Sequence, residues 1–188
     1  MPPKVKIAKE DIIKTAVALV KENGQTALNA RAIASALNCS TQPVFSNFST
    51  MEELQKEVID EAYKIYQIFL ADEVNSNKYP KYKSYGLAYI RFAMEEKELF
   101  KLLFMRDRSL EDTTPSLDFE EAVRMIMQSN GVNHETATLI HLEVWTCVHG
   151  IGAMLATSFL TLEWELISNI LSDVYQGIRA RHVSEEPK

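Results

Sequence analysis

Helix-forming residues dominate this chain, and few residues interrupt them. Only 6 glycines and 6 prolines occur in 188 residues, and long runs are rich in alanine, leucine, isoleucine, methionine, lysine and glutamate. The alternation of apolar and polar residues that is typical of strands is scarce. The apolar fraction of 46% and the charged fraction of 24% are those of a folded globular protein and exclude a disordered chain. The sequence therefore predicts an all-α fold.

Positive charge is concentrated at the N-terminal end of the chain. Residues 1–50 contain six basic and three acidic residues, whereas the remaining 138 residues contain 14 basic and 23 acidic ones. This asymmetry predicts a small, mildly basic head on a larger acidic body. We place the boundary after residue 49, which gives domains at residues 1–49 and 50–188.

The chain has the features of a cytoplasmic protein. Its first residues, MPPKVKIAKED, lack the apolar core of a signal peptide, and no run reaches the ~18 apolar residues of a membrane span. Cys39 and Cys147 show no pairing pattern, which favours reduced thiols. We therefore expect a cytoplasmic location and no membrane partner.

The N-terminal head begins with two predicted helices. Apolar residues recur every three or four positions over residues 9–22, which predicts an amphipathic helix. Asn23 and Gly24 are expected to end it, because both residue types readily adopt the left-handed conformation. Asn29 is expected to cap a second helix of about two turns, which ends near Asn38.

A third short helix is predicted from the segment NCSTQPVFSNF, residues 38–48. Ser40 is expected to cap its N-terminus, and Pro43 falls in the first turn, where a missing N–H breaks no helical hydrogen bond. Val44 and Phe48 are four residues apart and share the buried side. The side chains left facing outwards are Thr41, Gln42, Ser46 and Asn47. Two short helices joined by a tight turn predict a helix-turn-helix.

Residues at the start of this third helix are suited to contact with base edges. Gln42 can address adenine through two hydrogen bonds, and the methyl group of Thr41 can meet the methyl group of thymine. The segment therefore predicts a DNA-binding head.

Residues 12–54 resemble the DNA-binding head of the tetracycline-repressor (TetR) family, over the whole head and without a gap. The family pattern falls on Gly24, Arg31-Ile33-Ala34, Ser40, Phe45-Phe48 and Leu54. Further along, the body resembles the Trp-His-Gly subtype of the family. The segments that carry this second resemblance are YIRFAMEEKELFKLLF, from Tyr89, and VWTCVHGIGAM, with Trp145, His149 and Gly150.

The resemblance implies about nine helices, three in a helix-turn-helix head and the rest in a larger body that dimerises and binds a ligand. It implies a ligand-responsive transcriptional regulator, most often a repressor, that binds a near-palindromic operator in double-stranded DNA as a homodimer. It also implies release from DNA by a small apolar ligand. Two long helices of each subunit would form the dimer interface. The alternative for their glycines is close packing inside one subunit.

The head departs from the family pattern at three positions. Where the family usually has Tyr, His and Lys, this sequence has Phe45, Asn47 and Met51. Phe45 has no hydroxyl and Met51 has no charge, and each lost cation contact is expected to lower the log–log salt slope of binding by roughly 0.9. Phe45 either packs under the head or lies against the sugar-phosphate backbone. Either this protein binds DNA less strongly, or Lys4, Lys6 and Arg31 supply the phosphate contacts instead, and we favour the second interpretation.

The expected DNA-binding set combines the outward face of the third helix with the caps and cations around it. Its members are Lys4, Lys6, Asn29, Arg31, Ser40, Thr41, Gln42, Phe45, Ser46, Asn47 and Thr50.

The body is predicted to contain long helices separated by two loops. A helix over residues 50–74 begins with a capping box of Thr50 and Glu53. The two loops are expected at residues 75–86 and 106–116. Two further long helices are expected at residues 134–156 and 162–179. A set rich in methionine and phenylalanine forms either core or the lining of an apolar ligand pocket. The candidate ligand-binding residues are Phe100, Leu103, Phe104, Met125, Trp145 and His149.

The sequence carries no signature of an enzyme, a metal site or a cofactor. His134, His141 and His149 are seven and eight residues apart, which puts neighbours roughly 10–12 Å apart on a helix, too far to share one ion. We interpret His149 and Trp145 as a hydrogen-bonding pair. Two alternatives to a regulator stay open: a protein–protein interaction module with a degenerate head, and an all-helical enzyme with an apolar pocket.

Overall fold

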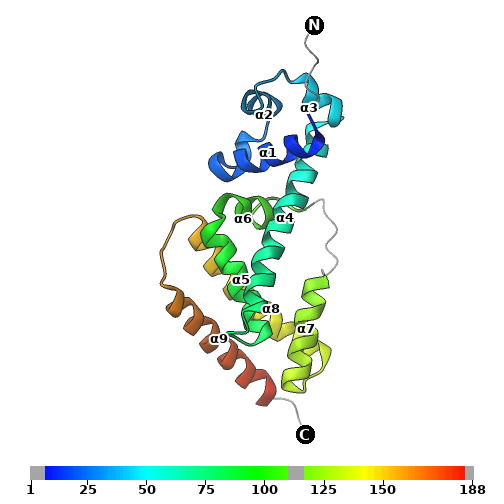
Figure 1. Ribbon diagram of the computed structural model, residues 1–188. Coiled ribbons are helices and arrows are strands. Elements are labelled where there is room, and N and C mark those ends of the chain that lie inside the picture. The colour runs from blue at the N-terminus through cyan, green and yellow to red at the C-terminus, as the bar shows by residue number, and fades with distance from the viewer. Residues whose placement is uncertain (1–6, 110–116, 185–188) are drawn as a thin grey trace. The chain divides into compact units, whose positions relative to one another are not determined.

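The computed structural model describes residues 7–109 and 117–184. Within this part of the chain it contains nine α-helices, one 3₁₀ turn at Gln25–Ala27 and no strand (Figure 1). The helices are α1 (Lys9–Asn23), α2 (Ala30–Ala36), α3 (Gln42–Asn47), α4 (Met51–Asn75), α5 (Lys81–Glu95), α6 (Lys97–Phe104), α7 (Leu117–Asn130), α8 (His134–Ala156) and α9 (Trp164–Ser184). The predicted all-α fold is confirmed.

Contacts between residues divide the chain into two compact units. The first comprises Met1–Ile68 and Glu96–Arg106, and the second comprises Phe69–Glu95 and Asp107–Lys188. The first unit therefore holds α1, α2, α3, α6 and most of α4, and the second holds α5, α7, α8, α9 and the last residues of α4. The proposed domain boundary after residue 49 stays a prediction.

The first helix of the first unit follows the predicted apolar stripe. Ile12, Ala16 and Val20 on α1 are fully buried. Gly24 ends the helix as expected, with a φ of 76°, and its N–H donates to the carbonyl of Val20. A Cβ added at Gly24 would lie 2.9 Å from a carboxylate oxygen of Glu98 on α6, the helix that packs beside α1 (Figure 1). Gly24 therefore serves both the turn and a close approach of two helices.

The second helix has the predicted cap and the predicted end. The Oδ1 atom of Asn29 accepts a hydrogen bond from the N–H of Ala32 at 2.9 Å. Asn38 lies beyond the helix in the left-handed region, with a φ of 51°. Ile33 and Ala34 are buried, which anchors this two-turn helix to the core of the unit.

The third helix is shorter at its start than predicted. Its N-cap is Thr41, and the prediction of Ser40 as the cap is wrong. Thr41 has helical dihedral angles and its side chain makes no capping hydrogen bond, because side-chain capping requires an extended backbone at the cap. Pro43 lies in the first turn, and Val44 and Phe48 are buried, as expected.

The long helix α4 begins one residue later than predicted, after Thr50. The Oγ1 atom of Thr50 accepts a hydrogen bond from the N–H of Glu53 at 3.2 Å. The carboxylate of Glu53 in turn accepts one from the N–H of Ser49 at 2.7 Å. The predicted capping pair is therefore present, although the glutamate reaches Ser49 and not the cap residue itself.

In the second unit, α8 packs against α5, α7 and α9. The predicted loop at residues 75–86 is too long, because α5 already begins at Lys81. Gly86 lies inside α5, where an added Cβ would lie 3.2 Å from a methyl group of Val148 and 3.4 Å from one of Leu171. This glycine permits close helix packing and does not mark a turn. Most of the second predicted loop, residues 110–116, lies outside the described residues.

The helices α8 and α9 were both expected. The bounds predicted for α8 are confirmed, whereas α9 begins two residues later and ends five residues later than predicted. Among the described residues, α8 is long and apolar enough to cross a membrane, judged by length and composition alone, with a mean hydropathy of 1.4. By this criterion α8 resembles a membrane span, which we did not expect from the sequence. Buried core helices pass the same test, and 44% of that window is buried.

Candidate DNA-binding surface

The outward face of α3 presents a mixed polar and apolar surface. Gln42, Phe45 and Ser46 are exposed, and their spacing of three and four residues puts them on one side of the helix. The ring of Phe45 is 53% exposed, so this residue does not pack under the head. On the opposite side, Val44 and Phe48 are buried at 0% and 2% exposure and fix the orientation of the helix.

Two residues that were expected to face outwards are half-buried. The Nδ2 atom of Asn47 donates to the carbonyl of Pro43 at 2.8 Å and to that of Ile7 at 3.5 Å. Thr41 is also half-buried, at the junction between α2 and α3. Asn47 thus ties α3 to the residues before α1, and its role in DNA contact stays a prediction.

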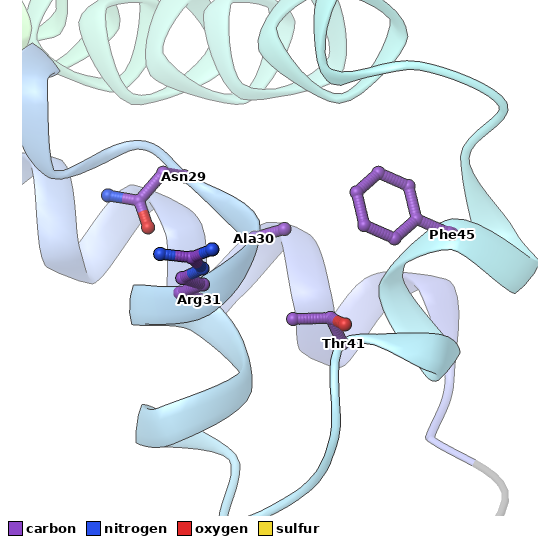
Figure 2. Close-up of a pocket in the computed structure, with 5 residues that line it drawn as sticks. All are labelled: Asn29, Ala30, Arg31, Thr41 and Phe45. Carbon is purple, nitrogen blue, oxygen red and sulfur yellow. The ribbon is translucent and has the colours of Figure 1, made fainter.

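A hollow of about 570 Å³ lies between the start of α2 and α3. Its lining residues are Asn29, Ala30, Arg31, Thr41 and Phe45. Figure 2 shows the Phe45 ring and the Ala30 methyl group facing each other across the hollow, with Thr41 between the two helices and the guanidinium of Arg31 beside Asn29. The structure therefore brings together four of the residues predicted to bind DNA. Ala30 was missed, because a small apolar residue next to a cap gives no signal in the sequence.

The basic residues of the first unit differ in their partners. Lys9 donates to the carboxylate of Glu57 at 2.5 Å, and this hydrogen bond raises the pKa of Lys9. Lys21 is similarly paired with Glu96 at 2.5 Å. Arg31 is exposed and makes no ion pair with any residue that the structure describes. Arg31 is thus the cation of the hollow that a phosphate can approach.

The remaining candidates for DNA contact lie at the margins of this surface. Ser40 is exposed just before α3, and Thr50 is exposed just after it, although its Oγ1 atom caps α4. Lys4 and Lys6 lie outside the described residues.

The six candidate ligand residues divide between the two units. Phe100, Leu103 and Phe104 lie on α6 in the first unit, where Phe100 is fully buried and its ring centroid is 5.3 Å from that of Phe104. Met125 on α7 and Trp145 and His149 on α8 lie in the second unit. Their role in ligand binding stays a prediction.

The pairing of Trp145 and His149 differs from the prediction. Their rings stack, with centroids 5.2 Å apart and an interplanar angle of 18°, whereas a hydrogen bond was expected. The Nδ1 atom of His149 instead shares a hydrogen bond of 2.8 Å with the hydroxyl of Tyr89 on α5. Burial lowers the pKa of His149, which favours the neutral ring.

A second histidine on α8 lies deeper in the second unit. His141 is buried, and its Nδ1 atom shares a hydrogen bond of 2.9 Å with the hydroxyl of Tyr82. The ring of Phe119 packs edge-on against it at 4.7 Å. Burial lowers the pKa of His141 to about 4 and raises that of Tyr82. Among the described residues, no group of three or more His, Cys, Asp or Glu side chains is placed to hold a metal ion.

This architecture is the all-α fold of TetR-like transcriptional regulators. Residues 83–166 match the family model described as the C-terminal domain of tetracyclin repressor-like proteins. No curated protein matches the chain in sequence.

Solved structures with the same fold cover most of the chain. A TetR-like transcriptional regulator from Rhodococcus sp. RHA1 is 12% identical, with a TM-score of 0.63, and the alignment covers 99% of this chain and 100% of that one. A TetR family member from Streptomyces coelicolor A3 is 14% identical, with a TM-score of 0.61 and coverage of 88% and 96%. The multidrug binding protein EbrR, complexed with imidazole, is 14% identical, with a TM-score of 0.60 and coverage of 88% of both chains.

Proposed function

We propose that this protein is a DNA-binding transcriptional regulator, a repressor that binds a near-palindromic operator as a homodimer in the cytoplasm. The observation that carries the proposal is the exposed face of α3, with Gln42 and Ser46 outward and the hollow of Arg31, Thr41 and Phe45 beside it. A short helix held by a buried face and presenting a polar one is the element that helix-turn-helix proteins lay in the major groove.

The residues of the head divide into those that recognise bases and those that hold the backbone. Gln42 contacts an adenine through its amide, and Ser46 lies one turn further along the same face. Arg31, with Lys4 and Lys6, supplies contacts to phosphates, which position the head without selecting a sequence. Two heads of a dimer would read half-sites about 34–36 Å apart.

The homodimer uses the outer faces of α8 and α9. On α8, Leu139, Leu142 and Trp145 are between 44% and 45% exposed, and Leu166 on α9 is 47% exposed. A Cβ added at Gly150 would meet no described residue within 4 Å, so this face of α8 is open to close approach by another helix. An exposed apolar stripe of this kind is typical of a protein–protein interface. We also propose that the body belongs to the Trp-His-Gly subtype.

Regulation requires a ligand that distinguishes two conformations. For a small apolar ligand of the body we propose two separate candidate contact sets, one in the second unit with Met125, Trp145 and His149, and one in the first unit with the α6 residues Phe100, Leu103 and Phe104. The ligand can release the operator only by its difference in affinity between the DNA-binding state and the other state. A panel of apolar compounds, with imidazole included because EbrR was solved with it, is the starting set for a release assay.

The test is selection of duplex DNA by the full chain, followed by gel shift at low salt. The expected result is a paired half-site bound by a dimer, with the affinity falling steeply as salt rises. A double variant, Arg31→Ala with Gln42→Ala, is the matched negative control, since both side chains are exposed and their loss leaves the core intact. Failure of the wild-type chain to shift any duplex at low salt favours the interaction-module alternative, which the exposed apolar ring of Phe45 supports.

A further inference from the structure

The hollow beside α3 is apolar where a backbone-binding site would be polar. Phe45 supplies a ring with no hydroxyl, Ala30 supplies a methyl group, and Thr41 supplies a methyl group next to its hydroxyl. Figure 2 shows the ring and the Ala30 methyl group turned toward the same space. Polar atoms come from the Thr41 hydroxyl and, on the other side, from Asn29 and Arg31.

We propose that this hollow reads thymine by its 5-methyl group. The methyl group of one thymine in each half-site packs against the ring of Phe45, with the methyl groups of Thr41 and Ala30 beside it. The proposal rests on the proposed function, because it requires that the head binds duplex DNA. It adds to that function a specificity-determining residue, Phe45, and the base that it selects.

The chemistry of the major groove favours this occupant over others. Among the base edges displayed there, the methyl group of thymine is the apolar one, and the remaining groups are hydrogen-bond donors or acceptors. A phenylalanine ring can satisfy none of those polar groups. An aromatic side chain that is 53% exposed on the same helical face as Gln42 therefore gains most by covering a methyl group.

The spacing along α3 places the two contacts on neighbouring bases. Gln42 and Phe45 are three residues apart, which is a rise of about 4.5 Å along the helix. Successive base pairs are about 3.4 Å apart along the duplex. If Gln42 binds adenine, the thymine covered by Phe45 lies in the same base pair or the next one. The half-site thus contains either one A·T pair that both residues contact or two adjacent A·T pairs.

The polar side of the hollow suits the backbone next to that thymine. Arg31 is exposed and has no ion-pair partner among the described residues, so its charge is free for a phosphate. Asn29 lies beside it, with Oδ1 committed to capping α2. The charge of Arg31 is complementary to the nucleotide whose methyl group enters the apolar side, and a small uncharged ligand would not use it.

The test replaces thymine by uracil in a bound operator. Duplex DNA is first selected from a random library by the full chain, and each thymine of the selected sequence is then changed singly to deoxyuridine. This change removes the methyl group and keeps every hydrogen-bonding atom of the base. We expect one position per half-site at which affinity falls about fourfold, the value of one buried methyl group, with smaller changes elsewhere.

Two variants assign the effect to Phe45. In Phe45→Ala, the sensitive position should become indifferent to the methyl group, whereas Lys14→Ala, at an exposed residue of α1 that does not line the hollow, should retain the full discrimination. Phe45 is exposed, so circular dichroism and thermal unfolding should show an intact fold in both variants.

The outcomes separate this proposal from the proposed function. If the wild-type chain binds a selected operator with equal affinity at every uracil substitution, the methyl-reading proposal is overturned and the regulator stands. Discrimination that persists unchanged in Phe45→Ala also overturns it. If no duplex is bound at low salt, both fall together.

Discussion

The interior of the second unit and the outer face of α3 use polar groups in opposite ways. Inside the second unit, several polar side chains are paired with one another. The hydroxyl of Tyr82 is 2.9 Å from Nδ1 of His141, and Arg91 on α5 donates to the carboxylate of Glu73 at the end of α4, at 3.1 Å. The side chain of Glu73 is only 8% exposed. Buried polar groups of this kind require partners, since an unpaired one destabilises the fold.

On the outer face of α3 and at the neighbouring start of α2, Gln42 and Arg31 are left without such partners. The amide of Gln42 and the guanidinium of Arg31 make no hydrogen bond with the residues that the structure describes. Both side chains are exposed to solvent, so they contribute little to stability and are available for contact with another molecule. Substitutions of the paired residues in the second unit should therefore change stability, whereas substitutions on α3 should change binding.

The largest effect on stability is expected from Arg91→Met. This change leaves the carboxylate of Glu73 buried without its cation, and breaking a buried pair costs about 3 kcal/mol or more. It also removes the cation–π contact of Arg91 with Phe69, at 4.8 Å. Urea denaturation of the full chain measures the loss.

The control for this prediction is Lys64→Met on α4. Lys64 pairs with Glu61 at 2.9 Å, but its side chain is largely exposed, and exposed pairs of this kind contribute little to stability. A similar loss of stability in the two variants would contradict the view that burial decides the role of Arg91.

Acid is expected to destabilise the second unit through His141. Burial holds the pKa of His141 at about 4, below the value of 6.5 for an exposed histidine. Between these two values the unfolded chain binds a proton that the folded chain does not, so the free energy of unfolding falls as pH decreases from about 6.5 to about 4. The loss is of the order of 3 kcal/mol at most.

The variant His141→Gln isolates this effect. Burial also lowers the pKa of His149, which adds a loss of the same sign, so the comparison must be made between variant and wild type. The variant should be less stable at neutral pH, because it loses the contact with Tyr82, and its stability should depend less on pH between 6.5 and 4. Parallel pH profiles would exclude His141 as the source.

On α3, Gln42→Ala is expected to change binding and leave stability unaltered. Loss of two hydrogen bonds to adenine should cost about 1–3 kcal/mol at that base pair, and should make its identity unimportant. Competition between the selected operator and one changed at that pair measures the preference. The unfolding free energy should stay within about 0.5 kcal/mol of the wild type, since Gln42 is exposed. Undiminished preference in the variant would remove Gln42 from the reading set.

The features that the sequence predicted correctly depend on neighbouring residues. Asn29 caps α2, Gly24 ends α1 and Thr50 caps α4, because caps and turns follow from side chains within four residues. The prediction for Ser40 was wrong because Ser40 and Thr41 are adjacent hydroxyl residues, and the sequence alone does not show which of them directly precedes the helix. Gly86 was misread as a turn because its packing against Val148 depends on a residue far away in the chain.

The same distinction applies to the candidate sites. The α3 face was predictable in part: helical spacing puts Gln42 and Ser46 on one side and both are exposed, whereas Thr41 and Asn47, also expected to face outwards, are half-buried, and the position of Phe45 was left open. The partner of His149 was not, because Tyr89 is 60 residues earlier and only tertiary packing brings the two rings together. A short-range pattern therefore identifies a helix that carries a site, whereas the pairing of two helices requires the structure.

The smallest effect is expected from Arg31→Ala, and it tests whether the unpaired cation of the hollow binds backbone or base. A phosphate contact is independent of sequence, so the variant should lose affinity to a similar extent for selected and scrambled duplexes. Its log–log salt slope should fall by roughly 0.9. Lys14→Ala is the matched control, because Lys14 is exposed on α1 and does not line the hollow, and its slope should be unchanged. If Arg31→Ala weakens binding to the selected operator alone, the guanidinium contacts a base, and the polar side of the hollow also reads sequence.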